Sequence, residues 1–146
     1  MTKALHAQNP RRKIAVLLVD DNPTYRASLC TFFESDERIE IVGQAGDGRE
    51  AVKKALVLKP DVILMDIAMP VLNGLDATEQ ILVTNHAAKV LMLSAYDDDA
   101  YIQRAIALGA VGFLTKQTAV TKLTDAICEV AKGKTFFSPA IIKRMG

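Results

Sequence analysis

Five polar side chains in this 146-residue chain stand directly after short apolar runs, where groups of these types could act together. Three are carboxylates, one is a hydroxyl and one is an ammonium. Each apolar run has the length and branching of a buried strand, and open parallel sheets bind their ligands beyond the carboxyl ends of the strands. We therefore expect the five side chains to converge on one rim of a sheet: Asp20, Asp21, Asp66, Ser94 and Lys116.

Three carboxylates at one rim repel one another, and a sheet protein has no structural use for that repulsion. The arrangement becomes favourable if a hard cation binds among them, because Mg²⁺ prefers carboxylate and water oxygens. Ser94 adds a hydroxyl and Lys116 adds a mobile positive charge, so the rim offers what a phosphoryl group requires around it. Taken singly, each residue has a simpler explanation as a helix cap, a turn residue or a solvated charge. Their coincidence at four strand ends favours the phosphoryl site.

The segment 61–70, DVILMDIAMP, carries the central carboxylate of this group. Its apolar run from Val62 to Met65 is typical of a strand buried on both faces. Asp66 stands where the run stops, and Met69-Pro70 then directs the chain out of the strand. We expect Asp66 to lie at the mouth of the sheet, partly exposed, on a rigid stem.

Apolar strands alternate with helical patterns along the whole chain. Asn22-Pro23 has the cap and first-position residues of a helix start, and the helix after Gly48 is expected to bury Leu56 with its other apolar residues. Such alternation predicts a doubly wound α/β fold, in which helices cover both faces of a parallel sheet. The five expected strands are residues 14–19, 39–45, 61–66, 89–93 and 111–114.

Length and composition fit one domain with one core. Half of the residues are hydrophobic, and the net charge of +1 points neither toward nor away from nucleic acid. The sequence shows no apolar run of membrane-spanning length and no secretory signal, so a cytoplasmic location is the default expectation. We divide the chain into a tail, 1–13, a domain, 14–132, and a linker, 133–146, that begins a sixth helix leading to an output domain absent from this chain.

The chain resembles the receiver domains of two-component response regulators. The matching motifs are the acidic pair Asp20-Asp21, the DVILMDIAMP segment, Asn73-Gly74, Ser94-Ala95 and the GFLTK segment ending at Lys116. The resemblance extends from Lys13 to about Lys132 and implies a flavodoxin-like sheet of strand order 2-1-3-4-5. It also implies a signalling switch, not a turnover enzyme, that assists its own phosphorylation and dephosphorylation.

The resemblance assigns a role to each residue of the rim. Asp66 would accept a phosphoryl group from a sensor histidine kinase, and Ser94 and Lys116 would each bind a phosphoryl oxygen. The metal would be Mg²⁺, and Phe113 would occupy the aromatic switch position, without the hydroxyl of the commoner tyrosine. The expected metal-binding groups are Asp21, Asp66 and the backbone carbonyl of Ala68, with Asp20 acting through water.

A narrower similarity concerns the output of the switch. The segments SAYDDDAYIQRAIALGAVGFLTK and GKTFFSPAIIKRM are similar to regulators that carry a LuxR-type helix-turn-helix domain, which would control transcription. In that case DNA would be bound only through the absent domain, and phosphorylation would strengthen a homodimer through the face between the fourth and fifth helices.

Two other functions fit the same topology. A phosphohydrolase with an aspartyl nucleophile would need two aspartates spaced two apart after the first strand, where this sequence has Asn22 in the second place. A flavin- or nucleotide-binding domain would need a Gly-rich phosphate loop, and here Asp20-Asp21 would repel a phosphate.

Overall fold

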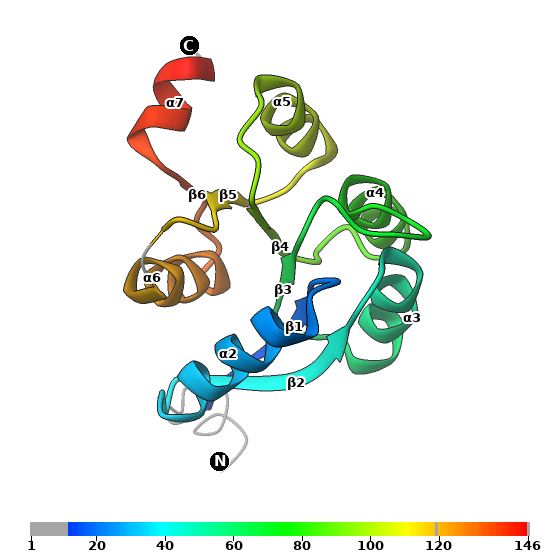
Figure 1. The fold of residues 1–146 in the computed structure, drawn as a ribbon, viewed down its shortest axis with the longest axis vertical. Helices are drawn as coiled ribbons and strands as arrows, with labels where there is room; N and C mark the ends of the chain where they lie inside the picture. Colours follow the sequence, from blue (N-terminus) through cyan, green and yellow to red (C-terminus); the bar gives the residue numbers. More distant parts are fainter. Residues whose placement is uncertain (1–11, 119, 146) are drawn as a thin grey trace, which may run out of the picture.

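The computed structural model describes residues 12–118 and 120–145. A six-stranded sheet runs through the molecule in the order β2-β1-β3-β4-β5-β6, and every neighbouring pair is parallel (Figure 1). This confirms the doubly wound α/β fold and its 2-1-3-4-5 order, and it adds a short edge strand. The strands are β1 Ile14–Val19, β2 Ile39–Ala45, β3 Val62–Met65, β4 Val90–Ser94, β5 Gly112–Thr115 and β6 Phe136–Phe137.

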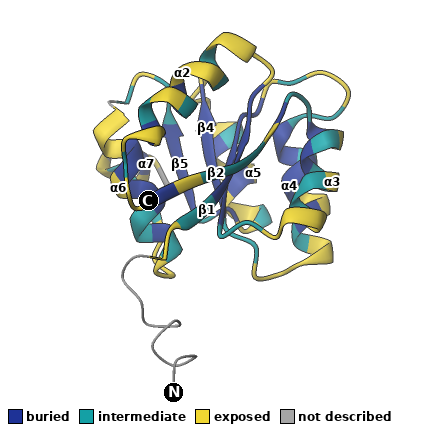
Figure 2. Ribbon diagram, turned by 90° about the horizontal axis from the view of Figure 1, so that it is seen from below, coloured by how far each residue is buried: buried dark blue, intermediate teal, exposed yellow. Residues whose placement is uncertain are grey.

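Six helices cover the two faces of the sheet. Two of them, α2 and α6, lie on one face, while α3, α4, α5 and the short α7 lie on the other (Figure 1). Figure 2 shows the resulting layers, with buried strands inside and exposed outer surfaces on the helices. The helices are α2 Pro23–Glu34, α3 Gly48–Leu58, α4 Gly74–Thr84, α5 Asp99–Leu108, α6 Val120–Ala131 and α7 Pro139–Met145.

The central strands are apolar because both of their faces are covered. All four residues of β3 are buried, and their side chains alternate between two core clusters. Ile63 and Met65 face α3, α4 and α5, whereas Val62 and Leu64 face α2 and α6. The alternation follows from the period of two in a strand, and the burial fixes the end of β3 as a rigid platform.

Helix starts follow the local signals in the sequence. The Asn22 side chain accepts hydrogen bonds from the amides of Thr24 and Tyr25, with Pro23 in the first turn, so the predicted start of α2 is confirmed. Asp47 caps α3 and Asn73 caps α4 in the same way. These side chains satisfy amides that have no partner within the helix.

One predicted core position is wrong. Leu56 was expected to face inward, but it is 60 % exposed. Ala51 is buried and Val52 and Ala55 pack against the core, so the buried stripe of α3 is narrower than the apolar pattern. Leu56 lies at the edge of this stripe and lines a groove between α3 and α4.

The C-terminal segment has more structure than its sequence suggests. The expected start of a sixth helix in this segment is confirmed by α7, and the Ser138 hydroxyl accepts a hydrogen bond from the Ile141 amide. The two residues of β6 precede it and pair with β5; no periodic pattern could have indicated so short a strand. Most of the predicted tail, residues 1–11, lies outside the described residues. None of the described helices is long and apolar enough to span a membrane.

Candidate functional site

The predicted acidic cluster forms where β1 and β3 end. Asp20 and Asp66 are buried, with 2 % and 5 % of their surfaces exposed, whereas Asp21 is exposed. One carboxylate oxygen from each of the three lies within 4.8 Å of the others. The structure thus brings the three carboxylates together as expected, but Asp66 is more buried than its position at a strand end suggested.

Lys116 reaches the same cluster from the end of β5. Its ammonium nitrogen lies 2.6 Å from Oδ2 of Asp20 and 3.6 Å from Oδ2 of Asp66. The backbone N–H of Lys116 donates to the carbonyl of Ser94, which fixes the root of the side chain against β4. A positive charge therefore stands between two buried carboxylates and offsets part of their repulsion.

Tyr25 is a neighbour of the site that the sequence did not reveal. The Lys116 ammonium lies 4.6 Å from the centroid of the Tyr25 ring, within the range of a cation–π contact. Tyr25 also packs, partly buried, against the core, and no local sequence pattern distinguishes this role from a contact with the site.

The electrostatics of the cluster disfavour the ionised form of its central carboxyl. Burial, and then the nearby charge of Asp20, raise the pKa of Asp66 from 3.8 to about 6. The ammonium of Lys116 and the amide of Ile67, which donates to Oδ1 of Asp66 at 2.9 Å, act in the opposite direction without cancelling the rise. Burial lowers the pKa of Lys116, but its hydrogen bond to Asp20 and the charge of Asp66 outweigh that effect and raise it.

Ser94 lies beside the cluster without bonding to it. It is fully buried at the end of β4, and its Oγ accepts a hydrogen bond from the Tyr96 amide at 3.0 Å. Strand β4 pairs with β3 on one side and β5 on the other, so Ser94 stands between the strand ends that carry Asp66 and Lys116. Phe113, on β5, is also fully buried.

The loop that follows Asp66 is held close to the cluster by Gly74. The Gly74 amide donates to the carbonyl of Ile67 at 2.8 Å, and a Cβ at this position would lie 1.8 Å from the backbone oxygen of Asp66. Only glycine permits that approach. Ala68, whose carbonyl was expected to bind the metal, lies in this loop and is exposed.

A strained turn completes the loop. The Leu72 amide donates to the carbonyl of Pro70 at 2.7 Å, and the intervening Val71 has a φ of 70°. The pattern is a γ-turn whose central residue is left-handed, a strained form, and β-branched residues rarely adopt such angles.

We expect Val71→Gly to stabilise the protein by about 1 kcal/mol, because glycine relieves the strain and loses only part of that gain to the flexibility of the unfolded chain. Val71 is 70 % exposed, so little packing is lost. Urea unfolding of the variant, with the exposed Val83→Gly in α4 as the comparison, measures the effect. Val83→Gly should destabilise the fold; equal destabilisation by both changes would contradict strain at Val71.

Comparison with known proteins places this fold and site in a family. The family described as response regulator receiver domain matches residues 16–128. The chain belongs to the response regulator receiver domain family, and it is thus a signalling module and not an enzyme of the usual kind. Membership implies a cognate histidine kinase and agrees with an acidic pocket of the kind that binds Mg²⁺ in receivers.

Individual relatives agree with this assignment. The response regulator protein VraR of Staphylococcus aureus is 36 % identical over 132 residues, which are 90 % of this chain and 63 % of that protein. A LuxR-family two-component response regulator from Aurantimonas sp. SI85-9A1 superposes with a TM-score of 0.85 at 29 % identity, covering 90 % of this chain and 94 % of the other. The chain therefore spans less than two thirds of the curated relative, and its similar structures include a regulator of the LuxR family.

One further similar structure contains BeF₃ and Mg²⁺. It is the CheX–CheY–BeF₃–Mg complex from Borrelia burgdorferi, with a TM-score of 0.74 and 29 % identity over 80 % of this chain and 88 % of the other.

Proposed function

We propose that Asp66 is the phosphoacceptor of this receiver domain. The observation that carries the proposal is the placement of a buried carboxylate at a strand end, within 4.8 Å of two others and 3.6 Å from an ammonium. In the reaction, an Asp66 oxygen forms a bond to phosphorus while the bond from phosphorus to the kinase histidine breaks. The histidine nitrogen retains that electron pair and takes a proton from water.

The donor set of the rim fits a hard cation. Asp21 and Asp66, with the Ala68 carbonyl, would hold Mg²⁺, and Asp20 would act on it through water. The ion supplies positive charge that offsets both the carboxylate repulsion and the charge of the transferring group. The exposed Asp21 gives access from solvent, while buried Asp20 and Asp66 supply the charge that would otherwise remain unbalanced.

Lys116 and Ser94 would bind the phosphorylated product. Lys116 already lies between Asp20 and Asp66, so a short movement of its ammonium exchanges the Asp20 oxygen for a phosphoryl oxygen. Among the described residues, the Ser94 Oγ accepts from the Tyr96 amide and donates to no acceptor, so its hydroxyl proton is available. Donation of that proton to the phosphoryl group would draw Ser94 toward β3, and Phe113 would repack beside it.

The proposed output of the phosphorylated domain is inferred from the similar proteins. Similarity to LuxR-family regulators supports control of transcription through a DNA-binding domain outside this chain, with the histidine kinase as the phosphoryl donor. Phosphorylation would change the face that bears α5 and β5, and self-association through that face is the expected consequence.

The test is treatment of the purified chain with acetyl phosphate, with either Mg²⁺ or EDTA. We expect one phosphoryl adduct per chain, dependent on Mg²⁺, stable in acid and labile in base, and located at Asp66 by peptide mass spectrometry. Continuous release of phosphate without an accumulating adduct would favour the phosphohydrolase instead. No adduct and no release would contradict the proposal.

A further inference from the structure

The C-terminal segment folds back and closes the edge of the sheet. Strand β6 pairs in parallel with β5, and the Phe136 amide donates to the carbonyl of Val111 at 2.8 Å. Gly112 permits this approach, since a Cβ there would lie 2.6 Å from the Phe136 carbonyl oxygen. The edge of β5 is therefore covered by the chain's own continuation.

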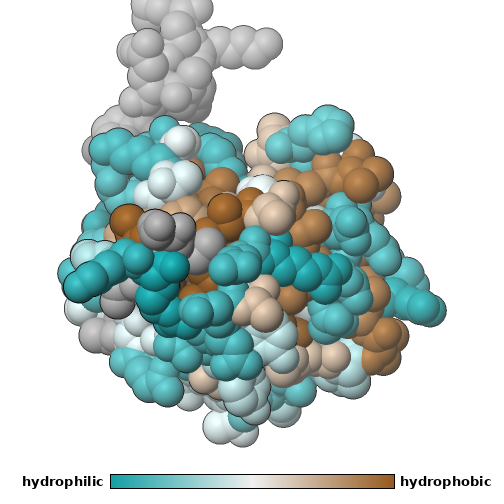
Figure 3. Space-filling model, turned by 90° about the horizontal axis from the view of Figure 1, so that it is seen from above, coloured by the Kyte–Doolittle hydropathy of each residue, from teal (hydrophilic) through white to brown (hydrophobic). Residues whose placement is uncertain are grey.

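Helix α7 then docks beside α5 (Figure 1). Ile141 is 4 % exposed and joins the core cluster that contains Ile102 of α5 and Phe113, while Ile142 is 59 % exposed. A helix of seven residues is marginal by itself, so α7 depends on this one-sided contact. Figure 3 views the side of the molecule where α5 and α7 lie, and hydrophilic side chains are interspersed with hydrophobic ones across it.

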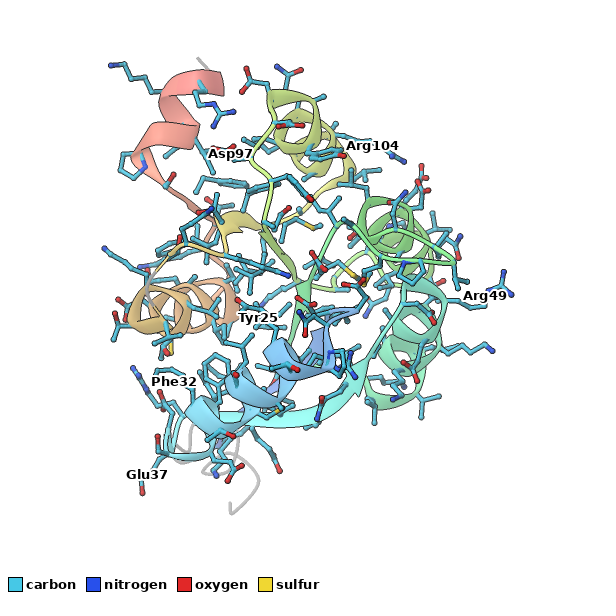
Figure 4. All side chains as sticks on the ribbon, in the orientation of Figure 1. Tyr25, Phe32, Glu37, Arg49, Asp97 and Arg104 are labelled. Atoms are coloured by element: carbon cyan, nitrogen blue, oxygen red, sulfur yellow. The ribbon has the colours of Figure 1, made fainter. Side chains whose placement is uncertain are left out.

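Arg144 links α7 to the first residue of α5 and to the loop that precedes it. Its Nε donates to Oδ1 of Asp99 at 2.8 Å, and its Nη1 lies 3.3 Å from Oδ2 of Asp97. A further bond runs from Nη2 to the backbone carbonyl of Asp97. Asp97 lies between α7 and α5 in Figure 4, and Arg144 follows it 47 positions later in the chain. One guanidinium therefore bridges the carboxylate and backbone oxygen of Asp97, in the loop, and the carboxylate of Asp99, at the first residue of α5.

The same loop begins at Ser94. Only residues 95–98 separate β4 from α5, and the Tyr96 amide is bonded to the Ser94 hydroxyl. Along the sheet, Asp66 follows β3 on one side of β4, whereas β6 lies on the other side beyond β5. A pull on Ser94 toward Asp66 would therefore act on Asp97 in the direction away from β6 and from the α7 that follows it.

We propose that α7 is a latch, closed by the contacts of Arg144 with Asp97 and Asp99, which phosphorylation of Asp66 opens. In the unmodified protein the latch holds the loop outward and keeps Phe137, Ile141 and the edge of β5 covered. Movement of Ser94 toward a phosphoryl group loosens the Arg144 contacts, and α7 then leaves α5. The latch itself stands on the contacts seen here, while its opening rests on the proposed function of Asp66.

Hydrogen exchange of the full chain tests the latch in the unmodified state. The reporting amides are Ile142, which donates to the Ser138 carbonyl, and Phe136, which donates to Val111. We expect Arg144→Glu to speed exchange at Ile142 by about tenfold or more, because local opening sets the rate. Lys143→Glu is the matched control, since it reverses the same charge at the neighbouring exposed position and should have a much smaller effect.

A charge exchange provides the second variant. Arg144→Glu combined with Asp99→Lys should restore a large part of the protection that Arg144→Glu alone removes. Equal exchange in Arg144→Glu and Lys143→Glu, or no recovery in the double variant, would overturn the latch without reference to phosphorylation.

Opening is tested with beryllofluoride and Mg²⁺, a mimic of the phosphoryl group, and fluorine NMR reports whether the mimic is bound. With the mimic bound, exchange at Ile142 should rise in the wild type and change little in Arg144→Glu, which is already open. A bound mimic with unchanged exchange would overturn the coupling and leave the proposed function standing. Absence of a bound fluorine signal would instead count against the proposed function, and the coupling would fail with it.

Discussion

Replacing Asp66 by asparagine should abolish phosphorylation by acetyl phosphate while the fold remains intact. The amide keeps the size of the carboxylate but lacks its nucleophilic charge. Its oxygen can still accept from the Ile67 amide, and Lys116 keeps its 2.6 Å contact with Asp20. Intact-mass spectrometry should show labelling at background in the variant, and circular dichroism should show an unchanged spectrum.

Asp125→Asn is the matched control for this result. Asp125 is an exposed carboxylate on α6, so the same chemical change away from the rim should leave labelling unchanged. Undiminished labelling of Asp66→Asn, with the phosphoryl group mapped to Asp20 or Asp21, would transfer the acceptor role to one of those residues.

The sheet and its rim were predictable because both depend on patterns of neighbouring residues in the sequence. Continuous apolar runs such as Val62 to Met65 indicate strands with two covered faces, and the carboxyl end of each run fixes where its polar residue stands. The alternation of strands and helices then determines which ends are neighbours. Asp20, Asp21, Asp66 and Lys116 therefore came together in the structure as the sequence indicated.

Burial was harder to predict than position. Asp66 was expected to be partly exposed, yet it is 5 % exposed. The difference arises from the loop after β3, which the Gly74 contact holds against the backbone of Asp66, and from Lys116, whose ammonium lies 3.6 Å from Asp66. Such covering depends on segments distant in the chain. Leu56 illustrates the reverse case, since its apolar type suggested burial but it lies at the edge of the α3 stripe.

Contacts between polar residues that are distant in the chain could not be predicted from the sequence. The pairing of Arg144 with Asp97 and Asp99 joins positions about 45 residues apart, and aspartates at the start of a helix are favoured there whether or not they have such a partner. The left-handed Val71 was equally hidden, because a valine gives no indication of a positive φ. Both features arise from tertiary constraints that override local preference.

The acidic pocket should also make the metal-free protein less stable as the pH rises from about 4 to above 6. Burial and the charge of Asp20 raise the pKa of Asp66 from 3.8 to about 6, so between these values the folded state binds a proton that the unfolded state has lost. Stability falls with pH wherever the folded state binds more protons. The contribution of this group is therefore fully present below pH 3.8 and is lost as the pH rises through 6.

Asp66→Asn removes this titration and should be more stable than the wild type at pH 7.5 in EDTA. The pKa rise corresponds at most to roughly 3 kcal/mol, and because the exposed Asp21 opens the pocket to screening water, we expect about 1–2 kcal/mol. Urea unfolding at pH 7.5 and pH 4 measures the difference in unfolding free energy between the variant and the wild type. The greater stability of the variant should be nearly absent at pH 4. Asp125→Asn should show no such dependence on pH.

Mg²⁺ should reduce the difference in stability between Asp66→Asn and the wild type at pH 7.5. An ion that binds only the folded state stabilises that state by mass action, and the wild type offers the ion one more carboxylate than Asp66→Asn does. If the wild type were the more stable protein at pH 7.5 in EDTA, the buried charge would be compensated by Lys116 alone. The repulsion inferred for the rim would then be absent.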